Sequence, residues 1–290
     1  MKQISLEELL EAGCHFGHQV TRSNPKARDF VFESRDNIQI IDLVKTKEGL
    51  DEAAEYVRGL GEKGGTLLVV GTKRQAKEVV EQEAVRVKEL LEKENKDKKG
   101  NLYFVTQRWI GGILTNFTEV SKNFKKLNDL KQKVSSPEER AIYTKKEIGI
   151  FEKEIQRLES FYNGISDMLQ KPDALFIIDS HLENLAVKEA SNMRVETVAI
   201  VDTNADPYII DHPIPANDDA VGSIKLIVSH ILGSWFEGIK SQKLPKKEEE
   251  KPVQKAQDKK ENLEKSEEKK VKKQEKPVKK EKEKKVAKKK

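Results

Sequence analysis

The sequence has one cysteine, few aromatic residues and no long apolar run. A single cysteine, Cys14, cannot form an internal disulfide, which excludes the class of small disulfide-bonded secreted proteins. No apolar segment behind a charged start resembles a secretory signal peptide, and no apolar run reaches the roughly 18 residues that a membrane-spanning helix needs. We therefore expect a soluble protein in a reducing, cytoplasmic compartment.

Positive charge is concentrated at one end of the chain. Residues 241–290 hold 21 lysines and 11 acidic residues, a net charge of +10, whereas the first 240 residues carry −5. This segment has no aromatic residue and too few apolar ones to offset the entropy of ordering. We predict that 241–290 is a disordered, basic tail rich in Lys and Glu. A solvated extension is the simpler interpretation, and binding to a polyanion is the alternative.

Outside the tail, short apolar runs alternate with segments of helical period. Five runs have the length and composition of buried strands: Asn37–Leu43, Thr66–Gly71, Leu102–Val105, Ala174–Ile178 and Thr197–Val201. Four segments with apolar residues at spacings of three and four predict helices: Val44–Leu60, Lys73–Glu94, Glu183–Met193 and Asp218–Ile239. The alternation predicts an α/β body with a doubly wound, Rossmann- or flavodoxin-like parallel sheet, made of residues 1–115 and 166–240.

Residues 116–165 interrupt this alternation. They contain no strand signal, but apolar residues recur at spacings of three and four from Val120 to Val134 and again from Ile148 to Phe161. Such narrow stripes are typical of helices that pack along a seam, and Ser135–Pro137 supplies a break between them. We predict an inserted α-helical coiled-coil hairpin that projects from the body. A packed satellite domain is the alternative.

Cys14, His15 and His18 lie within five residues of one another and are weak candidates for a metal site. A structural zinc ion usually needs four such ligands in two clusters, and the remaining histidines are scattered singly along the chain. A cysteine–histidine nucleophilic pair would need a third, orienting group that no local pattern supplies. The sequence therefore favours neither a metal nor a catalytic pair here.

Arg22 and Lys26 follow these histidines in a loop that also carries phenylalanines. Guanidinium groups bind phosphate in a bidentate manner, and aromatic rings can stack or anchor a loop, so this segment fits an RNA backbone. Core phenylalanines beside solvated arginines are an equally good interpretation.

A second basic loop, VVGTKRQA, places Lys73 and Arg74 at the start of a predicted helix, with Thr72 as the expected N-cap. Free N–H groups and two cations favour an anion at that position. The spacings of a P-loop and of a dinucleotide fingerprint are absent. We therefore expect the phosphate of a polymer and no nucleotide cofactor.

The loop TQRWIGGILTN follows the next predicted strand and contains Arg108 and Trp109. Its two glycines permit close backbone approach. Five lysines follow on the first hairpin helix: Lys122, Lys125, Lys126, Lys131 and Lys133. A cationic face beside an aromatic loop is typical of nucleic-acid binding, whereas the lysines alone also fit a solvated helix flank.

Asp202 follows a predicted strand, and Asp218 begins a predicted helix. A pair of carboxylates in such places could serve an α/β enzyme as acid and base. The residues around them favour a turn at Asp202 and helix capping at Asn217–Asp219. We therefore favour a structural role for both aspartates.

Seven motifs together resemble the bacterial small-subunit ribosomal protein S2 family, a universal family with an α/β body and a coiled-coil arm. They occur in the family's order and cover nearly all of residues 1–240: AGCHFGHQVTRSNPK, NIQIIDLVKT, VVGTKRQA, RWIGGILTNF, KPDALFIID, AIVDTNADP and IPANDDAVGSI. In that family the position of Cys14 more often carries an aliphatic residue, which further weakens the metal interpretation. The tail lies beyond the resemblance.

The resemblance implies a non-enzymatic structural constituent of the small ribosomal subunit that supports subunit assembly and translation. It implies binding to small-subunit rRNA near the junction of head and body, contacts with neighbouring ribosomal proteins, and a part in recruiting the mRNA-binding ribosomal protein S1. Our own assignment of the rRNA-binding residues is Arg22, Lys26, Lys73, Arg74 and Arg108, with Trp109 as a loop anchor or stacking residue. A mildly acidic body agrees with this role if positive charge is needed only on the docking face.

Two other function classes stay open on the sequence alone. An α/β enzyme could act through Asp202 and Asp218, and stoichiometric NAD or metal in the purified protein would support it. An adaptor similar to the laminin receptor could bind a protein partner through the arm. An arm deletion that keeps ribosome association but loses that partner would reveal it.

Overall fold

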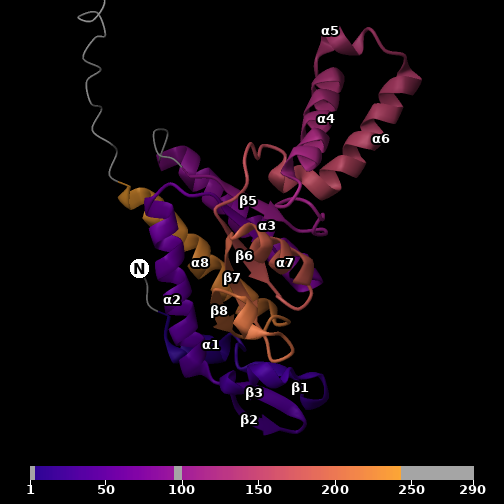
Figure 1. The fold of residues 1–290 in the computed structure, drawn as a ribbon. Coiled ribbons are helices and arrows are strands. Elements are labelled where there is room, and N and C mark those ends of the chain that lie inside the picture. The colour runs from indigo at the N-terminus through magenta and orange to yellow at the C-terminus, as the bar shows by residue number, and fades with distance from the viewer. Residues whose placement is uncertain (1–3, 95–99, 243–290) are drawn as a thin grey trace, which may run out of the picture. The chain divides into compact units, whose positions relative to one another are not determined.

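A five-stranded parallel sheet lies at the centre of the computed structural model, which describes residues 4–94 and 100–242 (Figure 1). The strands lie side by side in the order β5-β4-β6-β7-β8, and every neighbouring pair is parallel. Their bounds are β4 Leu67–Val70, β5 Leu102–Val105, β6 Ala174–Ile178, β7 Glu196–Val201 and β8 His212–Pro215. Numbered along the chain, this order is 2-1-3-4-5, that of flavodoxin-like folds. The predicted parallel α/β sheet is confirmed.

Helices cover both faces of the sheet because its strands are apolar on both sides. On β4, Leu67 and Val69 belong to one core, which includes residues of α2, α3 and α8, while Leu68 and Val70 belong to a second core with residues of α7 and of an inserted helical pair. The helices of the body are α2 Leu43–Glu62, α3 Arg74–Glu94, α7 Asn184–Met193 and α8 Val221–Ser241. The four predicted body helices agree with these within three residues at each end.

A second, antiparallel sheet corrects one prediction. The run Asn37–Leu43, predicted as a strand of the parallel sheet, instead forms β3 (Ile38–Ile41) between β1 (Phe16–Gln19) and β2 (Val31–Arg35). Asp36 and Asn37, both with positive φ, form the two-residue turn from β2 to β3. Such a turn suits a tight hairpin. A short apolar run alone does not say which sheet it joins.

Short helical segments fill the remainder of the N-terminal part and the loops of the body. Helix α1 begins after Ser5, whose hydroxyl accepts from the Glu8 N–H while the Glu8 carboxylate accepts from the Ser5 N–H. This reciprocal capping fixes the start of the helix. The bounds of these segments are α1 Leu6–Glu11, η1 Val20–Arg22, η2 Pro25–Phe30 and η4 Pro207–Ile209.

A pair of long helices is inserted between β5 and β6. They are α4 (Phe117–Ser135) and α6 (Lys145–Tyr162), joined through α5 (Pro137–Arg140), and the 3-10 turn η3 (Asn163–Ile165) leads back to the sheet. Helices α4 and α6 contact each other, and the predicted seam of α4 is buried from Val120 to Leu130. The break at Ser136 falls where the sequence predicts it.

The last position of the α6 seam differs from the prediction. Phe161 is exposed, and Tyr162 is buried instead, with its ring edge-on to Phe124 at 5.4 Å. The Tyr162 hydroxyl accepts a hydrogen bond from Asn123 Nδ2. A spacing of four from Leu158, rather than three, therefore points the aromatic ring toward α4.

Two further findings concern membrane-spanning helices and the predicted tail. Among the described residues, no helix is long and apolar enough to cross a membrane. The predicted tail, from residue 243 onward, lies outside the described residues.

Candidate functional site

Charged side chains gather at the edge of the parallel sheet where its strands end. The strand order reverses between β4 and β6, and ligands of open α/β sheets bind at such a reversal. Lys73 follows β4, Asp179 follows β6, Asp202 follows β7 and Asp218 follows β8. The fold thus brings one lysine and three aspartates, far apart in the sequence, to one edge.

Lys73 is the centre of a buried ion cluster. Its Nζ lies 2.7 Å from Asp218 Oδ1, 2.7 Å from Asp219 Oδ1 and 3.2 Å from Asp179 Oδ2, and its side chain is only 13% exposed. Burial lowers the pKa of Lys73, but the nearby carboxylates, above all Asp218, more than offset this, so that its pKa is raised. The charged ammonium faces these aspartates and not an open surface.

The loop between β4 and α3 does not form the predicted cap. The Thr72 hydroxyl donates to Glu183 Oε1, while the carbonyl of Lys73 accepts from the N–H of Ala76. Burial raises the pKa of Glu183, and a buried carboxyl group needs a hydrogen-bond partner. The prediction that Thr72 caps α3 is therefore wrong, because its hydroxyl is engaged with a neighbouring segment.

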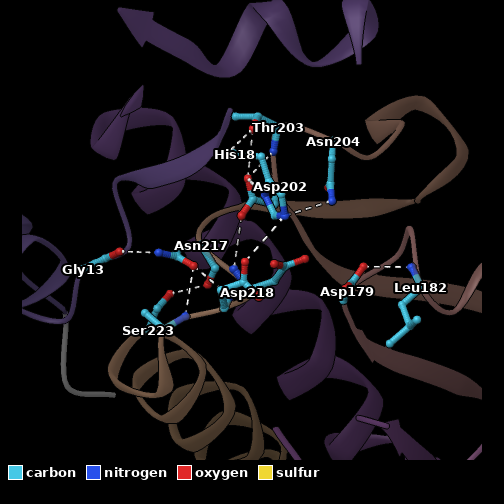
Figure 2. Close-up of polar contacts among 12 residues, drawn as sticks. Gly13, His18, Asp179, Leu182, Asp202, Thr203, Asn204, Asn217, Asp218 and Ser223 are labelled. Atoms are coloured by element: carbon cyan, nitrogen blue, oxygen red, sulfur yellow. Dashed lines mark hydrogen bonds and ion pairs between the residues drawn. The ribbon is translucent and has the colours of Figure 1, made fainter. Parts of the chain in front are cut away.

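His18 reaches the same edge from β1. Its Nδ1 lies 3.1 Å from Asp202 Oδ1 (Figure 2). Its Nε2 lies 3.5 Å from Asp219 Oδ2. Its backbone N–H donates to Thr203 Oγ1 at 2.9 Å, which fixes the strand against the loop after β7. The hydrogen bond to Asp202 raises the pKa of His18 despite partial burial.

Asp218 is the most buried of these carboxylates. Burial, reinforced by the charges of Asp179 and Asp202, raises its pKa to about 7, although Lys73 acts in the opposite direction. Its backbone N–H lies 3.4 Å from Asp202 Oδ2, so the two aspartates of the enzyme interpretation are in fact neighbours. The predicted helix cap at Asn217–Asp219 is wrong, because α8 begins at Val221 with Ala220 as its N-cap and has no acidic residue in its first turn. Asn217 Oδ1 instead accepts from the N–H groups of Asp219 and Ala220 in the turn before the helix.

The structure separates the three weak metal candidates. Cys14 is fully buried in the core, and burial raises the pKa of its thiol. The His15 ring packs against the ring of Phe16, with 4.0 Å between their centroids. Among the described residues, His18 alone of the three meets other potential ligand atoms, and those belong to Asp218 and Asp219. The potential co-ligands of His18 therefore lie about 200 residues further along the sequence.

Four of the six predicted rRNA contacts are exposed side chains, and the other two, Lys73 and Trp109, are largely buried. Arg22, Arg74 and Arg108 are exposed, and among the described residues none of them has a carboxylate within ion-pair distance. Lys26 pairs with Asp206 at 2.5 Å but remains 58% exposed. Lys73 is enclosed by aspartates as described above. Of the predicted contacts, three guanidinium groups without a partner in the described part of the chain and one paired ammonium are therefore accessible.

Trp109 is buried and anchors its loop. Its Nε1 donates to Glu189 Oε1 at 3.3 Å, and the same carboxylate accepts from the N–H groups of Gly112 at 2.8 Å, Leu114 at 3.2 Å and Thr115 at 3.3 Å. Gly112 has φ +98°, which favours glycine. Burial raises the pKa of Glu189, but these donors prevail and lower it.

Sequence reasoning missed Glu189, which organises the whole RWIGGILT loop. A signal was present, because Glu189 interrupts the apolar face that Ala186, Val187 and Ala190 form on α7. A charged residue on a buried helix face needs partners elsewhere in the fold. Nothing in the local sequence, however, said that a loop 75 residues earlier would supply them.

One family model matches the chain. It is described as ribosomal protein S2, and it matches residues 9–238. The match includes both sheets, the inserted helices and every residue of the ion cluster. The family consists of structural, non-enzymatic proteins of the small ribosomal subunit. Because the match spans well over half of its length, the chain belongs to the ribosomal protein S2 family.

Proposed function

We propose that the chain docks onto small-subunit rRNA through loops at the carboxyl-terminal edge of its parallel sheet. The observation that carries this proposal is the exposure of Arg22, Arg74 and Arg108 with no acidic partner among the described residues. Arg74 and Arg108 follow the adjacent strands β4 and β5. Arg22 lies in the N-terminal segment, which Asn24 ties to this edge through a 2.8 Å hydrogen bond to the Thr203 carbonyl.

Free guanidinium groups suit phosphate because each offers a planar fork of donors and stays charged. Lys26 is a further contact, since its ammonium is accessible and can exchange Asp206 for a phosphate. Lys73 and Trp109 have a different role in this proposal. Lys73 holds the loop that presents Arg74, and Trp109 with Glu189 holds the loop that presents Arg108.

A bridge between the two loops supports this division of roles. Lys77 Nζ donates to Gln107 Oε1 at 3.0 Å, so the first turn of α3 and the loop after β5 are joined beside the two arginines. Preorganised loops lose less entropy on binding than loops that must first be ordered. The arginines are therefore expected to bind the backbone of a folded RNA without large rearrangement.

The inserted helices have a second role in the proposal. We assign residues 116–165 as a coiled-coil arm for contacts with neighbouring ribosomal proteins, and the chain as a participant in the recruitment of ribosomal protein S1 in the cytoplasm. Three of the arm's lysines pair with its own glutamates: Lys122, Lys126 and Lys131. This internal pairing leaves the arm less suited to RNA than its lysine content suggests, and favours a protein partner.

The salt dependence of rRNA binding tests the docking face. The double variant Arg74→Gln/Arg108→Gln is compared with Arg86→Gln, which lies on the same helix α3 in a surface pair with Glu83. Each lost phosphate contact should reduce the slope of log K against log salt by roughly 0.7–0.9. We expect a reduced slope in the double variant and a wild-type slope in the control. An unchanged slope in the double variant would reject this face as the docking surface.

The arm is tested separately in purified subunits. Lys125→Glu and Lys133→Glu reverse the charge of two lysines. Of the five lysines on α4, these two form no ion pair among the described residues. We expect incorporation into small subunits to be retained and the amount of S1 protein per subunit to fall. Loss of another protein with S1 unchanged would point to the adaptor role instead, and an unchanged protein complement would exclude the arm as a contact surface.

A further inference from the structure

Three potential metal ligands from distant parts of the chain converge beside the ion cluster. One ligand atom each from His18, Asp218 and Asp219 lies within 4.8 Å of the others. His18 Nε2 and Asp219 Oδ2 are 3.5 Å apart, and two ligands held about 2.1 Å from a tetrahedral zinc ion lie about 3.4 Å apart. The histidine and this aspartate are thus already at the spacing of two metal ligands.

Asp218 contributes an oxygen that has no partner. Its side chain is 1% exposed, and while Oδ1 pairs with Lys73, Oδ2 has no hydrogen-bond partner among the described residues. Buried carboxylate oxygens are nearly always satisfied, because an unpartnered one loses its hydration without compensation. An unpartnered oxygen in a cluster of potential ligands is an observation that the ion cluster itself does not explain.

Lys73 pairs with one oxygen of each of the two aspartates. It approaches the Oδ1 atoms of Asp218 and Asp219, both at 2.7 Å, and leaves their Oδ2 atoms for another partner. The Oδ2 of Asp219 is the atom nearest to His18. The two aspartates therefore offer one oxygen each to the lysine and one oxygen each to a further group.

The orientation of His18 is also that of a metal ligand. Asp202 Oδ1 lies 3.1 Å from Nδ1 and holds a proton on that nitrogen (Figure 2). This leaves Nε2 facing Asp219 Oδ2. A carboxylate behind the imidazole is the usual partner of a metal-bound histidine, since it fixes the tautomer and makes the other nitrogen a better donor. Asn204 Nδ2, 3.3 Å from Nε2, can donate to the same lone pair in the absence of an ion.

We propose that His18 Nε2 and one oxygen each of Asp218 and Asp219 bind one divalent transition-metal ion of the Zn²⁺ type. An imidazole ligand favours zinc and its neighbours over magnesium or calcium, which prefer oxygen ligands. Three protein ligands leave a fourth position for water or for a group of a partner. Asp219 is 52% exposed, so the ion can enter from solvent.

The ion would connect two segments that the backbone does not join. His18 belongs to the N-terminal antiparallel sheet, and the aspartates belong to the loop before α8. A bound ion ties that sheet to the edge of the parallel sheet, close to the proposed docking arginines. This inference is independent of RNA binding, because none of the three ligands is a proposed RNA contact.

Equilibrium dialysis and calorimetry of the untagged full-length chain with Zn²⁺ alone test the proposal, after removal of metal with a chelator. We expect one Zn²⁺ per chain, and a loss of affinity of at least about tenfold in Asp219→Asn. This variant changes a half-exposed side chain, so its fold, checked by circular dichroism, should persist even where His18→Gln is less stable. Cobalt(II) should give the visible absorption of a tetrahedral site that Asp219→Asn lacks.

Matched controls decide between this site and others. Asp129→Asn changes an exposed aspartate on α4, His181→Gln changes an exposed histidine, and Cys14→Ser removes the thiol. All three should bind Zn²⁺ like the unaltered chain. The proposal is overturned if the unaltered chain binds no Zn²⁺, if Asp219→Asn and His18→Gln bind it normally, or if Cys14→Ser abolishes binding.

Discussion

Two ion pairs of equal length hold two different regions of this protein. Lys73 Nζ lies 2.7 Å from Asp218 at the edge of the parallel sheet, and Lys126 Nζ lies 2.7 Å from Glu154 between the helices of the inserted pair. The side chains of the first pair are 13% and 1% exposed, whereas those of the second are 53% and 25% exposed. Distance alone therefore does not separate them, and burial does.

The difference teaches how each region is stabilised. Removing one partner of a buried pair leaves an uncompensated charge in a medium that solvates it poorly. Removing one partner of an exposed pair leaves a charge in water, and the pair contributes little to begin with. We therefore expect the sheet edge to depend on its charges, and the helical pair to depend on its apolar seam.

The largest effect is expected from Lys73→Met at the sheet edge. This variant removes the cation that lowers the pKa of Asp218, so the buried carboxyl group must either stay charged without its partner or take up a proton. We expect the free energy of unfolding to fall by about 3–5 kcal/mol. Urea denaturation followed by circular dichroism measures it. A loss below that of an exposed lysine variant would show that the cluster tolerates an unpaired charge.

The second effect concerns the seam of the helical pair. Leu127 is fully buried on α4, and Leu127→Ala should lower the free energy of unfolding by about 2–4 kcal/mol through lost contacts and a cavity. Hydrogen exchange should report the weakening chiefly in residues 116–165. Ile142→Ala, at a side chain that is 76% exposed, is the matched control and should change little. Equal effects of the two variants would contradict a seam-stabilised pair.

The third prediction concerns burial without any ion pair, at His230 on α8. Burial lowers the pKa of His230 below its ordinary 6.5, although Asp51 and Glu237 oppose this, and its Nε2 has no partner among the described residues. The folded state therefore prefers the neutral ring. This contribution to stability is complete above pH 6.5 and is lost as the pH falls through 6.5 toward the lower folded pKa.

His230→Gln, which cannot be protonated, should accordingly lose less stability than the unaltered chain between pH 7 and pH 5. Urea denaturation across that range measures the difference of the two profiles. Parallel profiles would show that burial of this ring does not influence the acid sensitivity of the body.

The smallest effect is expected from Lys126→Met, the exposed counterpart of the first variant. Its pair with Glu154 is open to solvent, so the free energy of unfolding should change by less than about 1 kcal/mol. High salt should remove even this difference, because exposed charges are screened. A loss that approached the one expected for Lys73→Met would break the comparison. So would a loss that persisted in about 1 M salt, where the screening length is roughly 3 Å.

Periodicity predicted most of the fold because it reports which side of an element is buried. The helices of the body and the seam of α4 follow from apolar residues at spacings of three and four. The failures have physical reasons as well. Asn37–Leu43 is as apolar as a central strand, and only the turn at Asp36 and Asn37 folds it onto β2. On α6, the burial of Tyr162 in place of Phe161 depends on the facing helix.

For the candidate site, the residue types were easier to predict than their roles. Lys73 was identified from its place after a strand, yet its partners come from the ends of two other strands, Asp179 after β6 and Asp218 with Asp219 after β8. Asp218 reads locally as a helix cap, and Glu189 has no local motif at all. Which carboxylate meets which cation depends on strand order, and strand order is not encoded in any short segment.

The sequence by itself determined the class of the fold, the insertion of two helices, the basic loops and the family, because local periodicity, turn residues and motif order are readable without coordinates. Only the tertiary structure decided which charges are buried together. It enclosed Lys73, left Arg22, Arg74 and Arg108 without an acidic partner among the described residues, and placed His18 beside Asp218 and Asp219. The physical reason is that parallel strands bring their ends to one edge whatever their separation in the chain, and burial there determines the energy of each charge.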